Sequence, residues 1–185
     1  MEEKFINGEK VYFFDELTST MDLANELITQ NKNGVVVAKK QTEGRGRYGR
    51  KWYSEEGGLY FSFIEKNGEN EFLSEIVSFS IVKTLLEYGI NCKIKFPNDI
   101  IYRNKKIAGI LIEKKEEIYI IGIGINVNNY INEEINGISM KKILKREIKI
   151  EEVLEKFLIQ YKLNRENFQK NKKFYLKKWG DFLQK

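Results

Sequence analysis

A short segment rich in glycine and arginine stands out from the rest of the chain. Residues 43–52 read EGRGRYGRKW and hold three glycines and three arginines in ten positions. Glycine costs backbone entropy on folding, and neighbouring arginines repel one another unless an anion lies between them. Glycines also let backbone N–H groups turn toward an anion, and guanidinium groups bind carboxylates and phosphates as planar forks. The segment alone fits an anion-binding loop and a solvated basic loop about equally well.

Three further segments carry glycine or polar residues that a plain strand or turn does not need. KFPND at 95–99 places a lysine, an asparagine and an aspartate around the only proline, although alone it favours an ordinary turn. Gly109 interrupts an apolar, strand-like run, and Gly122, Gly124 and Asn126 alternate on one face of the next run. Small residues on one face of a strand leave a trough that a ligand or another backbone can enter.

Missing residue types exclude several kinds of site. The chain has no histidine, which excludes a Ser-His-Asp triad and a histidine-ligated zinc ion. Cys92 is the only cysteine, so no disulfide framework forms and a reducing compartment fits. The start MEEKFING is not a signal peptide, and no apolar run approaches the roughly 20 residues that span a bilayer. We expect a cytoplasmic protein without membrane segments, whose net charge of +5 modestly favours acidic partners.

The elements that must position these residues follow from hydrophobic periodicity and from turn residues. The sequence predicts strands at 11–17, 34–42, 59–65 and 92–96, an antiparallel meander over 99–127, and helices at 18–28, 72–89, 150–168 and 172–183. Ser19 and Thr20 are N-cap candidates for the first helix, and Gly89 is the expected C′ residue of the second. We predict an α+β fold, with a mostly antiparallel mixed sheet, helices covering one face, and residues 1–185 in a single domain.

Five motifs in this order resemble the catalytic domain of the biotin protein ligases. They are the Ser19-Thr20 pair, the Gly44–Trp52 loop, KFPND, KIAGIL at 106–111 and GIGIN at 122–126. The resemblance extends from about residue 11 to the final helix and implies the fold of the biotin/lipoate protein ligase catalytic domain. It also implies a two-step reaction that uses ATP, biotin and Mg²⁺. Biotin and ATP form biotinyl-5′-adenylate, and a lysine of a biotin-carrier domain of a biotin-dependent carboxylase then takes the acyl group.

The resemblance assigns roles to individual residues. The catalytic residues it implies are Lys106, Arg45, Arg47 and Asp99. For biotin it implies Ser19, Thr20, Gln41, Gly44, Arg45, Arg47, Lys106, Gly109, Leu111 and Gly122. For ATP and the adenylate it implies Arg47, Arg50, Lys51, Trp52, Asn98, Lys106 and Asn126. Asn98 and Asp99 either hold Mg²⁺ or orient the incoming lysine amine, and both roles stay open. We expect the loop to order over the ligand, with Trp52 as its cover.

Some positions depart from the family pattern. Phe96 stands where the family usually has tryptophan, and we expect it to keep an aromatic wall. Glu43 is a candidate ion-pair partner for a loop arginine. We expect neither the helix-turn-helix of repressor-type members nor the small C-terminal β-barrel, and therefore no sequence-specific DNA binding. The sequence is compatible with a minimal ligase and with a shortened form of a longer one. It is also compatible with a monomer and with a homodimer.

Two alternatives remain. A lipoate ligase or octanoyltransferase shares the fold, but Cys92 lies outside every motif, which disfavours a cysteine acyl-enzyme. A lipoate ligase needs a long apolar tunnel for its substrate, and the polar residues implied for biotin disfavour such a tunnel. The other alternative is a nucleic-acid-binding module that uses the glycine-arginine loop, for which the remaining motifs have no explanation.

Overall fold

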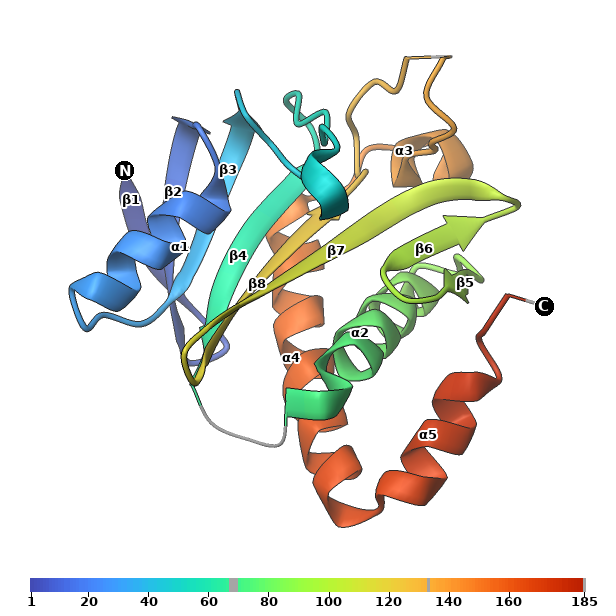
Figure 1. Ribbon diagram of the computed structural model, residues 1–185. Helices are drawn as coiled ribbons and strands as arrows, with labels where there is room; N and C mark the ends of the chain where they lie inside the picture. Colours follow the sequence, from blue (N-terminus) through green and yellow to red (C-terminus); the bar gives the residue numbers. More distant parts are fainter. Residues whose placement is uncertain (67–69, 133, 185) are drawn as a thin grey trace.

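One sheet organises the protein. The computed structural model describes residues 1–66, 70–132 and 134–184, and in this part of the chain eight strands pair in the order β1-β2-β3-β4-β8-β7-β6-β5 (Figure 1). The strands are β1 Glu2–Ile6, β2 Glu9–Leu17, β3 Val35–Gln41, β4 Leu59–Glu65, β5 Lys93–Lys95, β6 Asp99–Tyr102, β7 Lys105–Lys115 and β8 Ile118–Ile125. All neighbours run antiparallel except β2 and β3, which run parallel. The structure confirms the mostly antiparallel mixed sheet.

The helices pack on both faces of this sheet. They are α1 Thr20–Thr29, α2 Leu73–Glu87, α3 Met140–Leu144, α4 Ile150–Lys170 and α5 Lys172–Gly180, with 3₁₀ turns η1 Arg47–Gly49 and η2 Asn70–Phe72. The main core lies between the sheet and the helices α2 and α4. Phe157 of α4 packs edge-on against Phe61 of β4, with ring centroids 5.1 Å apart. Residues two apart on each strand share this face because strand side chains alternate.

The helix α1 lies on the opposite face. Its buried residues Met21, Ala24 and Leu27 pack with Val36 of β3 and Ile120 of β8 in a separate, smaller core. The prediction that the helices cover one face is therefore wrong for α1. Because α1 has only ten residues, it covers part of this face and leaves the end beside its own N-terminus open. That open end carries the glycines of β7 and β8.

The two ends of the chain complete the sheet. Strand β1 was not predicted, although the Asn7-Gly8 turn that joins it to β2 is a strong hairpin signal. Both residues have positive φ, 50° and 82°. At the other edge the C-terminal residues pair with β5, since the backbone N–H of Ile94 donates to Phe182 (2.7 Å) and that of Gln184 donates to Ile94 (2.9 Å). Among the described residues, no helix is long and apolar enough to cross a membrane.

Candidate active site

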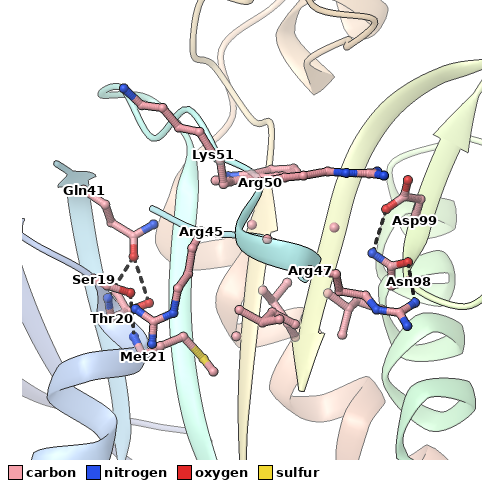
Figure 2. A pocket seen from close by; sticks show the side chains of 18 of the residues that line it. Ser19, Thr20, Met21, Gln41, Arg45, Arg47, Arg50, Lys51, Asn98 and Asp99 are labelled. Atoms are coloured by element: carbon pink, nitrogen blue, oxygen red, sulfur yellow. Dashed lines mark hydrogen bonds between the residues drawn. The ribbon is translucent and has the colours of Figure 1, made fainter. Parts of the chain in front are cut away.

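A pocket of about 190 Å³ opens on the face that α1 covers in part. It lies between the start of α1, the loop 44–52, the turn before β6, and the strands β7 and β8 (Figure 2). The predicted residues that line it are Ser19, Thr20, Gln41, Arg45, Arg47, Arg50, Lys51, Trp52, Asn98, Asp99, Lys106, Gly109, Leu111 and Gly122. Met21, Gly46, Tyr48, Ile110, Ile123 and Gly124 line it as well. The fold thus brings residues of all five motifs, which are far apart in the sequence, into one cavity.

A chain of hydrogen bonds forms the polar end of the pocket. The oxygen Oε1 of Gln41 accepts from the backbone N–H of Thr20 (2.8 Å) and from its hydroxyl (3.1 Å). The same hydroxyl lies 2.8 Å from the Ser62 hydroxyl, and Nε2 of Gln41 donates to Ser54 (2.8 Å). Ser19 caps α1, because its hydroxyl accepts from the second N–H of the helix (3.3 Å). The helix start therefore presents fixed donors and acceptors toward the cavity.

Glycines form the floor of the pocket. A methyl group on Gly124 would lie 2.5 Å from the ring of Trp52, and one on Gly109 would lie 2.9 Å from that ring. A methyl group on Gly122 would lie 2.6 Å from the sulfur of Met21. The indole of Trp52 thus lies directly on the strand backbones, and its buried Nε1 has no hydrogen-bond partner among the described residues. The absence of side chains lets Trp52 and Met21 reach the sheet surface.

The loop 44–52 is a small hairpin. Its ends are joined by the hydrogen bond from the Trp52 N–H to the Gly44 carbonyl (2.8 Å), and the Gly46 N–H donates to the Arg50 carbonyl (2.7 Å). Tyr48 at its tip is exposed and has a positive φ of 59°. Gly44 does not line the pocket. A methyl group there would lie 2.6 Å from the Trp52 carbonyl oxygen, so loop closure explains this glycine.

The loop arginines point to different ends of the pocket. Arg45 lies on the α1 side, near Ser19 and Met21, whereas Arg47 lies on the side of Asn98 (Figure 2). Arg45 donates through Nη1 to Asp22 (2.8 Å) and through Nε to Glu113 (3.3 Å). Partial burial disfavours its charged form, but these two carboxylates outweigh that cost and raise the pKa of Arg45 above its ordinary value.

At the other end, Arg47 has neutral partners. It donates to Oδ1 of Asn98 (3.3 Å) and to the hydroxyl of Tyr48 (3.2 Å). The amide of Asn98 donates in turn to Oδ1 of Asp99 (3.1 Å). This Oδ1 atom also lies 2.8 Å from Nζ of Lys106. Since Lys106 and Asp99 compensate each other, Arg47 keeps its full charge toward the cavity.

Arg50 and Lys51 add two more positive charges. Both side chains are exposed and line the pocket, and Arg50 extends toward the Asp99 side in Figure 2. Asp99 is the only acidic residue among those lining the pocket. Positive charge therefore exceeds negative charge at this end, which suits a polyanionic ligand.

Besides Gly44, two predicted residues lie outside the pocket lining. Asn126 is buried outside the pocket lining, where its amide donates to the Lys106 carbonyl (3.3 Å) and accepts from Asn129 (3.1 Å). It caps the end of β8 and ties it to β7. Phe96 is 58% exposed and packs edge-on against Trp179 of α5, with centroids 6.0 Å apart. The expectation that Phe96 forms an aromatic wall of the pocket is wrong, because Asn98 and Asp99 face the pocket and Phe96 turns toward α5.

Gly124, which strand alternation places on the same face as Gly122, lines the pocket with it. The lining residues that sequence reasoning missed left weak signals. Met21 follows Thr20 on α1 and looks like an ordinary core residue. The acid that pairs with Arg45 is not Glu43: its partners come from α1 and β7, which sequence proximity does not indicate.

No cluster of three or more metal-binding side chains occurs in the described ranges 1–66, 70–132 and 134–184. At the end of the pocket that holds Arg47 and Lys106, Asn98 and Asp99 carry an amide oxygen and a carboxylate. Mg²⁺ in nucleotide sites typically uses one or two protein carboxylates and otherwise binds phosphates and water. The two side chains therefore fit a Mg²⁺ ion that arrives with a nucleotide.

Comparison with known proteins shows where this sequence pattern and this fold recur. The sequence profile of the Biotin/lipoate A/B protein ligase family matches residues 13–128, more than half of the chain. The bifunctional ligase/repressor BirA of Bacillus subtilis is 39% identical over 141 residues, which are 69% of this chain and 43% of that protein. The chain thus spans about two fifths of the length of this curated relative.

Solved structures extend the similarity over most of the chain. The biotin protein ligase from Aquifex aeolicus, in complex with biotin and ATP, superposes with a TM-score of 0.77 at 35% identity, over 87% of this chain and 72% of that one. The biotin protein ligase from Leishmania major, in complex with biotinyl-5-AMP, superposes with a TM-score of 0.82 at 25% identity, over 94% and 81% of the two chains.

Proposed function

Because this chain belongs to the Biotin/lipoate A/B protein ligase family, we propose that it is an ATP-dependent biotin protein ligase. The observation that carries the proposal is a single cavity with a hydrogen-bonding end, where Arg45 is compensated by acidic partners, and an opposite end with excess positive charge. Biotin has the same polarity, with a cyclic urea at one end and a carboxylate at the other. The names of similar structures, which report biotin, ATP and biotinyl-5-AMP as ligands, support the same assignment.

The polar end suits the urea ring. That ring offers two N–H donors and one carbonyl acceptor, and each group left unpaired when buried costs about 1–3 kcal/mol. Ser19, Thr20 and Gln41 present hydroxyl and amide groups at this end. Leu111, and Met21 where it lies over Gly122, form the wall against which the bicycle packs, while Gly109 leaves room beside it for Trp52. A lipoyl or octanoyl chain carries no N–H donor and no urea carbonyl, so it would leave these polar groups unmatched.

The cationic end suits the first reaction step. An oxygen of the biotin carboxylate attacks the α-phosphorus of ATP, the new C–O–P bond forms, and the bond to pyrophosphate breaks. The carboxylate is ionised at neutral pH, so no general base is required. We assign charge neutralisation at the meeting point to Arg47 and Lys106, and binding of the departing phosphates to Arg50 and Lys51. Trp52 covers the adenylate.

We assign Asn98 and Asp99 to nucleotide binding and to the second step of the reaction. In that step the neutral amine of an acceptor lysine attacks the acyl carbon, the bond to AMP breaks, and a proton passes from the amine nitrogen to water. Asp99 is the only carboxylate of the pocket lining and is the candidate to orient this amine. Mg²⁺, bound to the ATP phosphates, has the oxygens of Asn98 and Asp99 available to it.

The proposal also includes the acceptor protein and the cellular compartment of the reaction. We assign the acceptor lysine to the biotin-carrier domain of a biotin-dependent carboxylase, and we place the reaction in the cytoplasm. Residues 1–185 act as a single catalytic domain, because β1 near one end of the described chain and residues 182–184 near the other both pair with the same sheet.

Titration calorimetry with biotin, lipoate and octanoate tests the substrate. We expect biotin to bind, more tightly with a non-hydrolysable ATP analogue present, and the two other acids to give no comparable heat. Biotin-dependent release of pyrophosphate tests the reaction. Lys106→Ala should lower it by about 100-fold or more, because a fixed charge at the reacting oxygens is lost.

Lys105→Ala is the matched control for Lys106→Ala. Lys105 is the neighbouring residue on β7, is exposed, and does not line the pocket. Pyrophosphate release by Lys105→Ala should stay within about twofold of wild type. Binding of lipoate or octanoate without binding of biotin would keep the fold and refute the substrate.

A further inference from the structure

Arg45 differs electrostatically from the other basic residues of the loop. Two carboxylates hold it, Asp22 on α1 at 2.8 Å and Glu113 on β7 at 3.3 Å. These acids come from elements on opposite sides of the pocket mouth, and all three side chains are partly buried, with 32%, 47% and 40% of the side chain exposed for Arg45, Asp22 and Glu113. By contrast, the partners of Arg47 are a neutral amide and a neutral phenol.

The local charge count argues against an anion-binding role for Arg45. Asp22 and Glu113 together carry one more charge than the guanidinium does. A carboxylate or phosphate approaching Arg45 would meet two fixed negative charges within a few ångströms of its target. It would have to displace at least one of them, and the displaced carboxylate would lose its hydrogen bonds. Arg47, which has no such competitors, is the better anion ligand.

Position supports a different role. The Arg45 side chain lies on the polar end of the pocket, next to Ser19, Thr20 and Met21, and away from Asn98 and Asp99 (Figure 2). Asp22 follows Met21 on α1, and Glu113 lies two residues beyond Leu111 on β7. Both Met21 and Leu111 line the pocket. The ion pairs therefore join the two walls of the end that receives the urea ring.

We propose that Asp22 and Glu113 are positioning residues that hold Arg45 as a strap across this end of the pocket. The strap keeps the α1 wall and the β7 wall together and slows the escape of the bound bicycle. Neutralisation of the carboxylate and the α-phosphate then rests with Arg47 and Lys106, and not with Arg45 as the motif alone suggests. The ligand named here rests on the proposed function, whereas the strap itself rests on the two ion pairs.

The test measures the dissociation rate of biotin by chasing labelled biotin from wild type, Asp22→Asn, Glu113→Gln and the double variant. Partly exposed ion pairs are weak, so each single substitution should raise the rate by a few-fold and the double variant by about tenfold. The KM for biotin should rise by similar factors, and kcat should change less than KM. Arg45→Met should also raise the dissociation rate, because it removes both ion pairs, although it leaves the two carboxylates without a counter-charge.

Two controls are a substitution that removes a charge outside the pocket and a change in salt concentration. Asp15→Asn removes the same charge from a surface pair with Lys39 (2.6 Å) that lies outside the pocket lining, and it should leave the dissociation rate unchanged. Salt screens ion pairs between partly exposed groups. Raising NaCl from about 50 to 500 mM should therefore speed dissociation from wild type more than from the double variant.

Two results would overturn the strap. One is a wild-type dissociation rate in the double variant. The other is a loss of kcat in Arg45→Met far beyond that of the double variant, since Arg45 would then act on the reacting groups. If wild type does not bind biotin, the proposed function fails. The strap is then tested by measuring amide hydrogen exchange in the ligand-free wild type and double variant. Unchanged exchange of the Arg45 and Gly46 amides in the double variant would then refute it.

Discussion

Glycines at three positions of β7 and β8 decide how close an aromatic ring can come to the sheet. Gly109 and Gly124 are register partners on these strands, and Trp52 lies over both. Gly122 plays the same part for Met21, whose side chain is flexible and can move aside. A rigid indole cannot adapt in this way, so the residue that lies above each glycine determines how much a methyl group costs.

The pair Gly124→Ala and Gly122→Ala tests this difference. At Gly124 the new methyl group lies 2.5 Å from the Trp52 ring, which must move as a unit. We expect Gly124→Ala to lower the free energy of unfolding by about 1–3 kcal/mol and to shift Trp52 fluorescence to the red. Gly122→Ala should cost less than about 1 kcal/mol, because only the end of Met21 must move. Urea unfolding followed by fluorescence measures both, and equal costs would contradict the argument.

Cys92 gives a prediction on reactivity. It lies in the main core, where burial raises the pKa of its thiol to about 12. A thiol titrates to thiolate only as the pH approaches its pKa, so at pH 8 the native protein holds almost none of the nucleophilic form. We expect native Cys92 to react with a disulfide reagent at least about 1000-fold more slowly than the urea-unfolded chain. Rapid labelling of the native protein would reopen the cysteine acyl-enzyme alternative.

Individual residue positions could be predicted from sequence where a local rule applied. The N-cap at Ser19 and the C′ glycine at Gly89, with φ of 77°, follow from helix-end chemistry. Asn126 and Phe96 follow no local rule. The partners of Asn126 are Asn129 and the Lys106 carbonyl, and they depend on how the chain turns after β8. The partner of Phe96 is Trp179, which depends on how the chain turns before β6.

Alternation along the strands separates structural from functional residues at the scale of the element. On β4, Phe61 and Phe63 face α4, whereas Ser62 on the other face bonds to Thr20 in the polar end of the pocket. On β8, Gly122 and Gly124 face the pocket, and Ile121 and Ile123 enter the main core. One face of the sheet therefore provides stability while the other provides the pocket.

Phe157→Ala tests this separation on α4. The ring is fully buried and packs against Phe61, so its removal should lower the free energy of unfolding by about 3–5 kcal/mol. If that variant does not fold, Phe157→Leu should cost less than about 1.5 kcal/mol. Ile159→Ala, on the exposed side of α4, should stay within about 0.5 kcal/mol of wild type. Biotin affinity of the folded variants should match wild type, and a large loss would mean that the two faces are coupled.

Elements without strong periodicity were harder to predict. The helix α3 has only five residues and begins at the cap Ser139, whose hydroxyl accepts from Lys142 (3.4 Å). Strand β1 is exposed along most of its length, so it shows no buried face. Both depend on contacts with distant parts of the chain, since β1 pairs with β2 and Met140 of α3 enters the main core.

The order of the strands belongs to the whole molecule. The central pair joins β4 to β8, which lie about sixty residues apart in sequence, and brings Ser62 opposite Gly122. Periodicity identified the strands other than β1 and the face of each, but not this pairing, because every strand with an apolar face can pack on every other. The parallel pair β2–β3 is an exception: a helix between two strands is the usual crossover of a parallel pair.

The same architecture predicts where ligands change local stability. The strands β4 and β8 lie in the middle of the sheet and have neighbours on both sides. The loop 44–52 is held by a few local hydrogen bonds, such as that from Gly46 to Arg50. Amides of such loops exchange through local opening, whereas those of central strands exchange through global unfolding. We expect fast exchange in the empty loop, and slow exchange in β4 and β8.

Hydrogen exchange with and without biotin and a non-hydrolysable ATP analogue measures this difference. We expect exchange in residues 44–52 to slow by about 10- to 100-fold, because anions placed between Arg47, Arg50 and Lys51 remove their mutual repulsion and close the loop. Biotin alone should protect the start of α1 more than the loop tip at Tyr48, since its urea ring meets Thr20 first. Protection spread evenly over the sheet would show instead that the ligands stabilise the whole fold and that the loop is already closed when empty.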